Sequence, residues 1–169
     1  MPDRETQAAA IALLELCKAK KLMIATAESC TGGLVVSALT DIAGSSAVVD
    51  RGFVTYTNEA KQDMLGVPAD TLSQHGAVSR ETAEAMANGV LAQAPADLAV
   101  SITGIAGPGG GSAAKPVGLV HFAAASRGGH RIHRERRYGD IGRAEVRRCA
   151  VLEALSILSE LASSETPKH

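Results

Sequence analysis

The sequence predicts an α/β protein: a three-layer α/β/α sandwich around a five-stranded mixed, mostly parallel sheet with one antiparallel strand. Three observations point to this class. Short apolar runs alternate with helix-like segments through much of the chain. Two strand-like runs then follow each other across Arg127-Gly128-Gly129, which is typical of a hairpin, and a long amphipathic segment closes the chain. Strands joined through helices run parallel and a hairpin reverses direction, so the sheet must be mixed.

Residue periodicity and turn residues place the individual elements. Helices are predicted where apolar residues recur every three or four positions, and strands where short apolar or β-branched runs are bounded by turn residues. In chain order, we expect a helix over 4–20, a strand over 22–27, a helix over 30–40, a strand over 47–56, helices over 58–65 and 80–94, strands over 97–103, 117–126 and 130–138, and a long helix marked by Val146 through Leu161. Asn58 and Ser79 are the expected caps of the two middle helices.

The composition indicates one domain over 1–169 with an aliphatic core. Hydrophobic residues make up 46% of the chain and aromatic residues only 2%, so Ala, Val, Leu and Ile must fill the interior. The sequence shows no interdomain linker and no internal repeat. The tail over 163–169 is expected to fray.

Charge and hydropathy narrow the class of function. A net charge of −1 favours neither nucleic acid nor a membrane surface as a partner. No stretch approaches the roughly 18 apolar residues of a membrane-spanning helix, and the N-terminus lacks the pattern of a signal peptide. The three cysteines are widely spaced and odd in number, which favours free thiols in a reducing compartment. We therefore expect a cytoplasmic protein.

Three polar segments follow predicted parallel strands. They are ESCTGG (28–33), the stretch from Tyr56 to Lys61, and the glycine-rich loop after Thr103. In open α/β sheets the ligand site forms beyond the carboxyl ends of the strands. We therefore expect these three segments to meet at one edge of the sheet.

Ser29 stands at a strand-to-helix junction and has two possible roles. It is either the cap of the following helix, as serine commonly is, or a nucleophile. In the second role, the backbone N–H groups of Cys30 and Thr31 would stabilise the oxyanion of an acyl-transfer intermediate. The Cys30 thiol is a rival nucleophile, but a small buried cysteine is the favoured interpretation.

A nucleophilic serine needs a base, and Lys61 with Tyr56 is the best-placed candidate. None of the five histidines lies at a predicted strand end facing Ser29, and His130 and His133 point to opposite faces of a strand, so they cannot share a metal. A lysine base needs a pKa about three units below its usual value, which burial can supply. The alternative is a solvated lysine on an amphipathic helix.

The loop TGIAGPGGG (103–111) lacks the sequence of either common phosphate-binding fingerprint. Its glycines still allow close approach of the backbone to a ligand, or they form a plain connector. Residues 127–148 hold eight arginines against three acidic residues, a pattern typical of a charged edge strand in which one or two arginines bind a substrate phosphate.

Together these segments resemble the CinA C-terminal domain family. The resemblance rests on ATAESCTGG (25–33), DIAGSSAVVDRGFVTYTNEAKQDMLGV (41–67) and SITGIAGPGGGSAAKPVGLVHFA (101–123). Characterised members of this family are nicotinamide-nucleotide amidohydrolases, so the resemblance implies hydrolysis of the amide of nicotinamide mononucleotide to nicotinic acid mononucleotide and ammonia. The family's N-terminal domain has no counterpart here, so the chain resembles a stand-alone form.

The resemblance also implies roles for individual residues. Ser29, Tyr56 and Lys61 match the family's catalytic serine, tyrosine and lysine. Many members read GDR where this chain reads GDIGR, and Arg143 is the candidate for that arginine across the inserted Ile141-Gly142. The expected substrate-binding residues are Thr31, Gly32, Gly33, Thr103, Gly104, Gly107, Gly109 and Arg143.

The expected partner is a small pyridine nucleotide, with neither a metal nor another cofactor, and a homo-oligomer is possible. Two other classes of function stay open at this point. One is a non-catalytic nucleotide-binding module in which Ser29 only caps a helix. The other is an interaction protein linked to competence or DNA damage.

Overall fold

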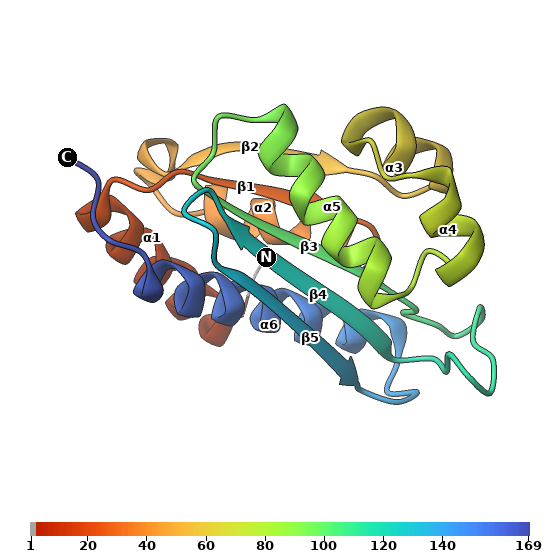
Figure 1. Cartoon of the computed structure of the whole chain (residues 1–169). Coiled ribbons are helices and arrows are strands. Elements are labelled where there is room, and N and C mark those ends of the chain that lie inside the picture. The colour runs from red at the N-terminus through yellow and green to blue at the C-terminus, as the bar shows by residue number, and fades with distance from the viewer. Residues whose placement is uncertain (1–2) are drawn as a thin grey trace.

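The computed structural model describes residues 3–169 and shows three layers (Figure 1). Helices α1 (Arg4–Lys20), α2 (Leu34–Thr40) and α6 (Arg143–Ser164) pack against one face of a central sheet. Helices α3 (Asn58–Leu65), α4 (Ala69–His75) and α5 (Arg80–Gln93) lie on the other face. The predicted α/β/α sandwich is confirmed.

The sheet has five strands in the order β2-β1-β3-β4-β5. Their bounds are β1 Ile24–Glu28, β2 Val49–Val54, β3 Leu98–Gly104, β4 Leu119–Ser126 and β5 Arg131–Arg137. β1 pairs in parallel with both β2 and β3, whereas β4 is antiparallel to both of its neighbours. The expected sheet, mostly parallel with one antiparallel strand, is therefore confirmed.

The second helix begins later than predicted. We expected it from residue 30, but residues 30–33 form turns and α2 starts at Leu34. Gly32 and Gly33 have φ values of +56° and +107°, in the left-handed region that ends or precedes regular helix and favours glycine. Five residues, 29–33, therefore separate the end of β1 from the start of α2, and Ser29 is the first of them.

Two further details on the α3 side differ from expectation. Thr57, not Asn58, caps α3, because its hydroxyl accepts a hydrogen bond from the Ala60 backbone N–H at 3.0 Å. Helix α4 was not predicted, because its seven residues bury only Leu72 and show too little periodicity. Ser79 caps α5 as expected.

The core is aliphatic, as the composition predicts, and is divided by the sheet into two parts. Every residue of β1 and β4 is buried, and leucine, isoleucine, valine and alanine side chains from the helices fill both sides. Phe122 is among the largest fully buried side chains, and so is Lys61. A fully buried lysine is rare unless it has a specific role or partners.

The C-terminal segment from residue 163, which was expected to fray, makes contacts with the rest of the fold. Helix α6 continues to Ser164, and the Lys168 backbone N–H donates to the Lys20 carbonyl at 2.8 Å. The Lys168 ammonium also contacts the Asp97 carboxylate at 2.9 Å. These contacts hold the tail against the end of α1. None of the helices formed by residues 3–169 has both the length and the apolar character needed to cross a membrane.

Candidate active site

A cavity of about 260 Å³ opens beyond the carboxyl ends of β1 and β3. The three polar segments that follow these strands and β2 meet there, as expected from the topology. Of the predicted residues, its lining includes Ser29, Cys30, Tyr56, Lys61, Thr103, Gly104, Gly107, Gly109 and Arg143. The cavity thus brings together residues that lie more than a hundred positions apart in the sequence, such as Ser29 and Arg143.

Glu28, the last residue of β1, caps helix α2 in place of Ser29. Its buried carboxylate accepts hydrogen bonds from the backbone N–H groups of Gly33 at 3.2 Å, Val35 at 2.9 Å and Val36 at 3.1 Å. An acidic group at a helix N-terminus also interacts favourably with the helix dipole. The interpretation of Ser29 as the helix cap is therefore wrong, and its hydroxyl is free for another partner.

The backbone N–H groups of the Ser29 turn can be accounted for one by one. Those of Ser29, Gly32 and Leu34 donate to the carbonyls of Ile102, Ser29 and Thr31, and Glu28 takes three more. Within the stretch 29–36, this leaves the N–H groups of Cys30 and Thr31 without an acceptor from another described residue. These are the two donors that the sequence suggests for an oxyanion.

Lys61 reaches Ser29 from the first turn of α3. Its Nζ lies 3.1 Å from the Ser29 Oγ, 2.9 Å from the Thr55 carbonyl oxygen and 3.1 Å from the Tyr56 carbonyl oxygen. The Thr55 N–H donates to the Glu28 carbonyl at 2.9 Å, which places the end of β2 beside the end of β1. The chain leaving β2 therefore carries both carbonyls and the lysine to the serine.

Burial lowers the pKa of Lys61, since its side chain is only 1% exposed. Within residues 3–169, no carboxylate forms an ion pair with it to offset the cost of burying the charge. The two carbonyl oxygens accept hydrogen bonds and cannot donate them. The Lys61 Nζ donates to both carbonyl oxygens and to the Ser29 Oγ.

Tyr56 contacts this pair through its backbone and not through its phenol. The Tyr56 carbonyl oxygen lies 3.1 Å from the Lys61 Nζ and 3.5 Å from the Ser29 Oγ. The side chain is 60% exposed, and its hydroxyl accepts a hydrogen bond from Arg143 at 3.3 Å. The structure thus links the Tyr56 phenol to Arg143 at the mouth of the cavity.

Arg143 also holds the glycine-rich loop. Its Nη1 donates to the Gly107 carbonyl oxygen at 2.9 Å. In the same wall, the Thr103 hydroxyl donates to the Ala77 carbonyl oxygen at 2.7 Å. Gly104 is required by close packing, because an added Cβ would lie 2.9 Å from the Leu119 carbonyl oxygen. The loop is therefore tied on one side to α6 and on the other to the segment after α4.

Thr31, Gly32 and Gly33 do not line the cavity, although they were expected to bind substrate. They turn into α2, and the two glycines allow the turn that Glu28 caps. The lining also includes Ile105, Ala106 and Gly110 of the expected ligand loop, and Ala77 and Val78, which were not expected there. Residues 77 and 78 follow the unpredicted α4, so no sequence signal placed them there.

The Cys30 thiol is not an alternative nucleophile. Burial raises its pKa to about 12, so it stays protonated and unreactive near neutral pH. Its side chain belongs to the buried core on the α1, α2 and α6 side of the sheet. The interpretation of Cys30 as a packing residue agrees with this environment.

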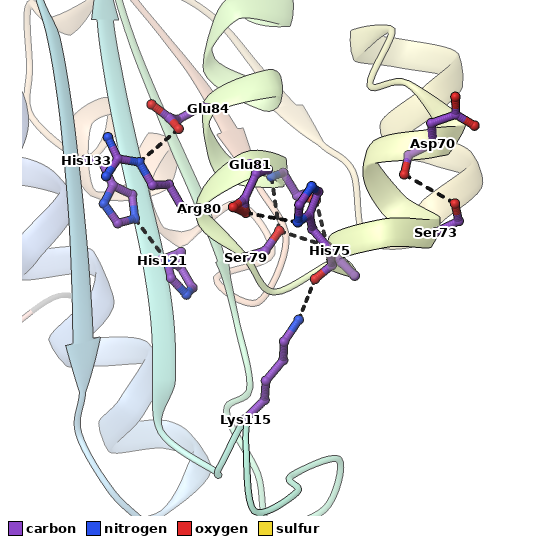
Figure 2. Close-up of polar contacts among 12 residues, drawn as sticks. Asp70, Ser73, His75, Ser79, Arg80, Glu81, Glu84, Lys115, His121 and His133 are labelled. Atoms are coloured by element: carbon purple, nitrogen blue, oxygen red, sulfur yellow. Dashed lines mark hydrogen bonds and ion pairs between the residues drawn. The ribbon is translucent and has the colours of Figure 1, made fainter.

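The histidines lie away from Ser29. His121 of β4 and His133 of β5 contact each other, with Nδ1 and Nε2 3.0 Å apart, and Figure 2 shows them beside Arg80 and Glu84. His130 instead contacts the Glu165 carboxylate, so His130 and His133 do not converge. Across residues 3–169, no three His, Cys, Asp or Glu side chains cluster as ligands for a metal.

Several arginines in 127–148 form ion pairs at the protein surface. Arg134, Arg136 and Arg137 form ion pairs with acidic residues of β5 and α6, as expected for a charged edge strand. Of this group, Arg143 lines the cavity. Arg147, one helical turn further along α6, donates to the backbone carbonyls of Cys30 and Thr31.

Comparison with known proteins gives one consistent family. A family model described as the CinA C-terminal domain matches residues 6–162. Nicotinamide-nucleotide amidohydrolase PncC of Escherichia coli K12 is 52% identical over 159 residues, which are 94% of this chain and 95% of that protein. A CinA-like protein of Synechococcus sp. RCC307 is 51% identical over 147 residues, 86% of this chain and 35% of that protein.

Among solved structures, the competence/damage inducible protein CihA of Agrobacterium tumefaciens superposes with a TM-score of 0.94 at 57% identity, covering 95% of this chain and 98% of that one. A CinA superfamily protein of Klebsiella pneumoniae superposes with a TM-score of 0.89 at 36% identity, covering 95% and 99%. The chain thus spans nearly all of some relatives and about a third of others.

Proposed function

This chain belongs to the CinA C-terminal domain family, and we propose that it is an amidohydrolase that converts nicotinamide mononucleotide to nicotinic acid mononucleotide and ammonia. The E. coli relative named for nicotinamide-nucleotide amidohydrolysis matches over 95% of its own length. That coverage supports a reaction carried by this domain alone. The three free thiols support a reducing, cytoplasmic setting.

The observation that carries the proposal is the contact between Lys61 and Ser29. A buried lysine with a lowered pKa and its Nζ 3.1 Å from a serine hydroxyl is the arrangement of a serine–lysine hydrolase. Neutral Lys61 takes the Ser29 proton while Oγ attacks the carboxamide carbon. The Thr55 and Tyr56 carbonyls then stabilise the ammonium that forms.

The tetrahedral intermediate carries a negative oxygen that needs donors. The free N–H groups of Cys30 and Thr31 are the candidates, since every other N–H between 29 and 36 is already used. One preorganised donor of this kind is worth about 10²–10³-fold in kcat. As the intermediate collapses, the Lys61 ammonium returns its proton to the departing amine, which leaves as ammonia.

Hydrolysis of the acyl-enzyme repeats the same steps with water. Lys61 takes a proton from water, the hydroxide attacks the acyl carbon, and the proton passes to the Ser29 oxygen as nicotinic acid mononucleotide leaves. The phosphate of the nucleotide fits the outer part of the cavity. There Arg143 provides a positive charge and the exposed Gly109 provides accessible backbone.

The test is ammonia release from nicotinamide mononucleotide by the wild-type protein and by Ser29→Ala. Removal of the Oγ should reduce turnover to background, while the melting temperature changes by only a few degrees because Ser29 does not cap α2. Ser37→Ala is a matched control on α2, away from the cavity. Near wild-type turnover in Ser29→Ala would mean that another group is the nucleophile. Substrate binding without any turnover by the wild type would instead favour a nucleotide-binding module.

A further inference from the structure

Arg147 of α6 donates to two backbone carbonyls of the turn that follows Ser29. Its Nε donates to the Cys30 carbonyl oxygen at 3.1 Å, and its Nη2 donates to the Thr31 carbonyl oxygen at 3.4 Å. Within residues 3–169 it forms no ion pair, whereas its neighbour Arg148 contacts three carboxylates. The half-buried guanidinium of Arg147 is thus committed to the turn that follows Ser29.

The geometry of the peptide bond makes this contact informative. A trans peptide unit is planar, and its C=O and N–H point in opposite directions. The Cys30 carbonyl and the Thr31 N–H belong to the same unit. By holding the Cys30 carbonyl on the α6 side, Arg147 fixes the Thr31 N–H in the direction that points away from α6.

No other described group restrains that peptide unit directly. The unit before it is held because the Ser29 carbonyl accepts from Gly32, and the unit after it is held because the Thr31 carbonyl accepts from Leu34. Glu28 restrains the turn from Gly33 onward. The Cys30 carbonyl has Arg147 as its hydrogen-bond donor within residues 3–169.

We propose that Arg147 is a positioning residue for the amide hydrolysis: it orients the Cys30–Thr31 peptide so that the Thr31 N–H is available to the oxyanion. This inference rests on the proposed function. Arg147 does not line the cavity, so it acts on the transition state through the peptide and not by contact with the substrate. Its loss should therefore reduce kcat and leave KM nearly unchanged.

The charge and the geometry of Arg147 can be separated by two substitutions. Arg147→Gln removes the charge and the paired donors, and Arg147→Lys keeps the charge but cannot donate to both carbonyls from a planar fork. We expect kcat for ammonia release from nicotinamide mononucleotide to fall about 10- to 100-fold in Arg147→Gln, with KM within about threefold. Arg147→Lys should lose nearly as much. Arg148→Gln, the adjacent surface arginine, should stay within about twofold of the wild type.

Two further measurements distinguish positioning from general damage to the fold. The pH at which the rate reaches half its plateau should be the same in Arg147→Gln and the wild type, because the Ser29–Lys61 contact is intact. Added methylguanidinium should restore part of kcat in Arg147→Ala and none in Ser29→Ala.

Several results would overturn the inference. One is an Arg147→Gln enzyme with kcat within twofold of the wild type, and another is Arg147→Lys with full activity. A shifted pH profile would mean that the Ser29–Lys61 pair itself has moved, which also contradicts a role confined to the peptide. If Arg147→Gln does not fold, Arg147→Lys and the rescue experiment decide the matter. A wild-type protein that releases no ammonia would contradict the proposed function instead.

Discussion

The molecule contains two pairs of contacting polar side chains, Ser29 with Lys61 and His121 with His133, that look alike in isolation. Lys61 lies 3.1 Å from Ser29, and His121 lies 3.0 Å from His133. Burial lowers the pKa of Lys61, of His121 and of His133. In contact distance and in the direction of these pKa shifts, the two pairs are similar.

Their surroundings differ. The Ser29–Lys61 pair stands where parallel strands end, beside a cavity and two unused N–H groups. The histidine pair stands on the antiparallel β4 and β5, outside that cavity. It is bordered by charged side chains such as Glu135 (Figure 2 shows the neighbouring Arg80–Glu84 ion pair). A shifted pKa by itself therefore indicates only burial. A catalytic site is indicated when a nucleophile also lies beside backbone N–H groups that have no acceptor.

Substitution of Lys61, which removes one member of the first pair, should have the largest effect on activity. Lys61→Met keeps the bulk of the side chain and removes the base, so kcat/KM should fall by about 10²–10⁴-fold. In the wild type the rate should rise with pH through the lowered pKa of Lys61, because only the neutral amine accepts the serine proton. Ammonia release between pH 5 and 10 measures both. The matched change in the histidine pair, His133→Gln, should leave kcat/KM within about threefold of the wild type. A loss as large as that of Lys61→Met would contradict the conclusion that only the Ser29–Lys61 pair is catalytic.

The next largest effect should come from the support of the serine turn. Glu28→Gln removes the carboxylate charge that receives three backbone N–H groups. We expect a loss of about 1–3 kcal/mol in the free energy of unfolding and a fall of about tenfold or more in kcat. Urea unfolding and the ammonia assay measure the two effects. Glu59→Gln, on the exposed side of α3, is the control; a Glu28→Gln protein of unchanged stability would show that the cap is not stabilising.

A smaller effect is expected from the Tyr56 phenol. Tyr56→Phe keeps the carbonyl that contacts Lys61 and removes only the hydroxyl bonded to Arg143. The loss in kcat/KM should be below about tenfold, well short of that in Lys61→Met. A loss as large as that of Lys61→Met would assign the phenol a direct part in proton transfer.

The smallest expected effect is on the pH dependence of the free energy of unfolding, which differs between the two pairs. The folded-state pKa values of His121 and His133 lie below the unfolded value near 6.5, so the unfolded chain binds more protons just below that pH, and stability falls as the pH is lowered through this window. His133→Gln should weaken this dependence, measured by urea unfolding from pH 4.5 to 7. The exposed His169→Gln should not. Lys61 acts in the same direction in a window that ends near pH 10.4, so Lys61→Met should remove the slope of the stability curve just below that pH.

Much of the fold could be predicted because each long helix and each strand has its own local pattern of apolar residues. Strand-like runs alternating with amphipathic helices led to the sheet and its single reversed strand, and strand-end topology brought Ser29, Lys61 and Thr103 together. The missed α4 is short, lies between Pro68 and Gly76, and buries a single leucine. Periodicity needs more than two turns to become visible.

The finer parts of the site depend on contacts that sequence spacing does not encode. Serine is the usual cap, yet the glutamate one residue earlier accepts from the N–H groups of Gly33, Val35 and Val36 at the start of α2. Tyr56 was expected beside Lys61, and the backbone is there while the phenol points to Arg143. Which atom of a residue enters a site is set by the direction of the chain at that point, and a residue-level pattern carries no such information.

The position of Tyr56 has a consequence for spectroscopy. The chain contains two tyrosines and no tryptophan, so its near-ultraviolet emission comes from Tyr56 and Tyr138 alone. Tyr56 is exposed at the cavity, whereas the hydroxyl of Tyr138 donates to the backbone carbonyl of Cys149 and the ring packs against the core. The solvent-quenchable part of the tyrosine signal therefore originates at the cavity mouth. A ligand that enters the cavity would change the emission of the unmodified protein without any attached dye.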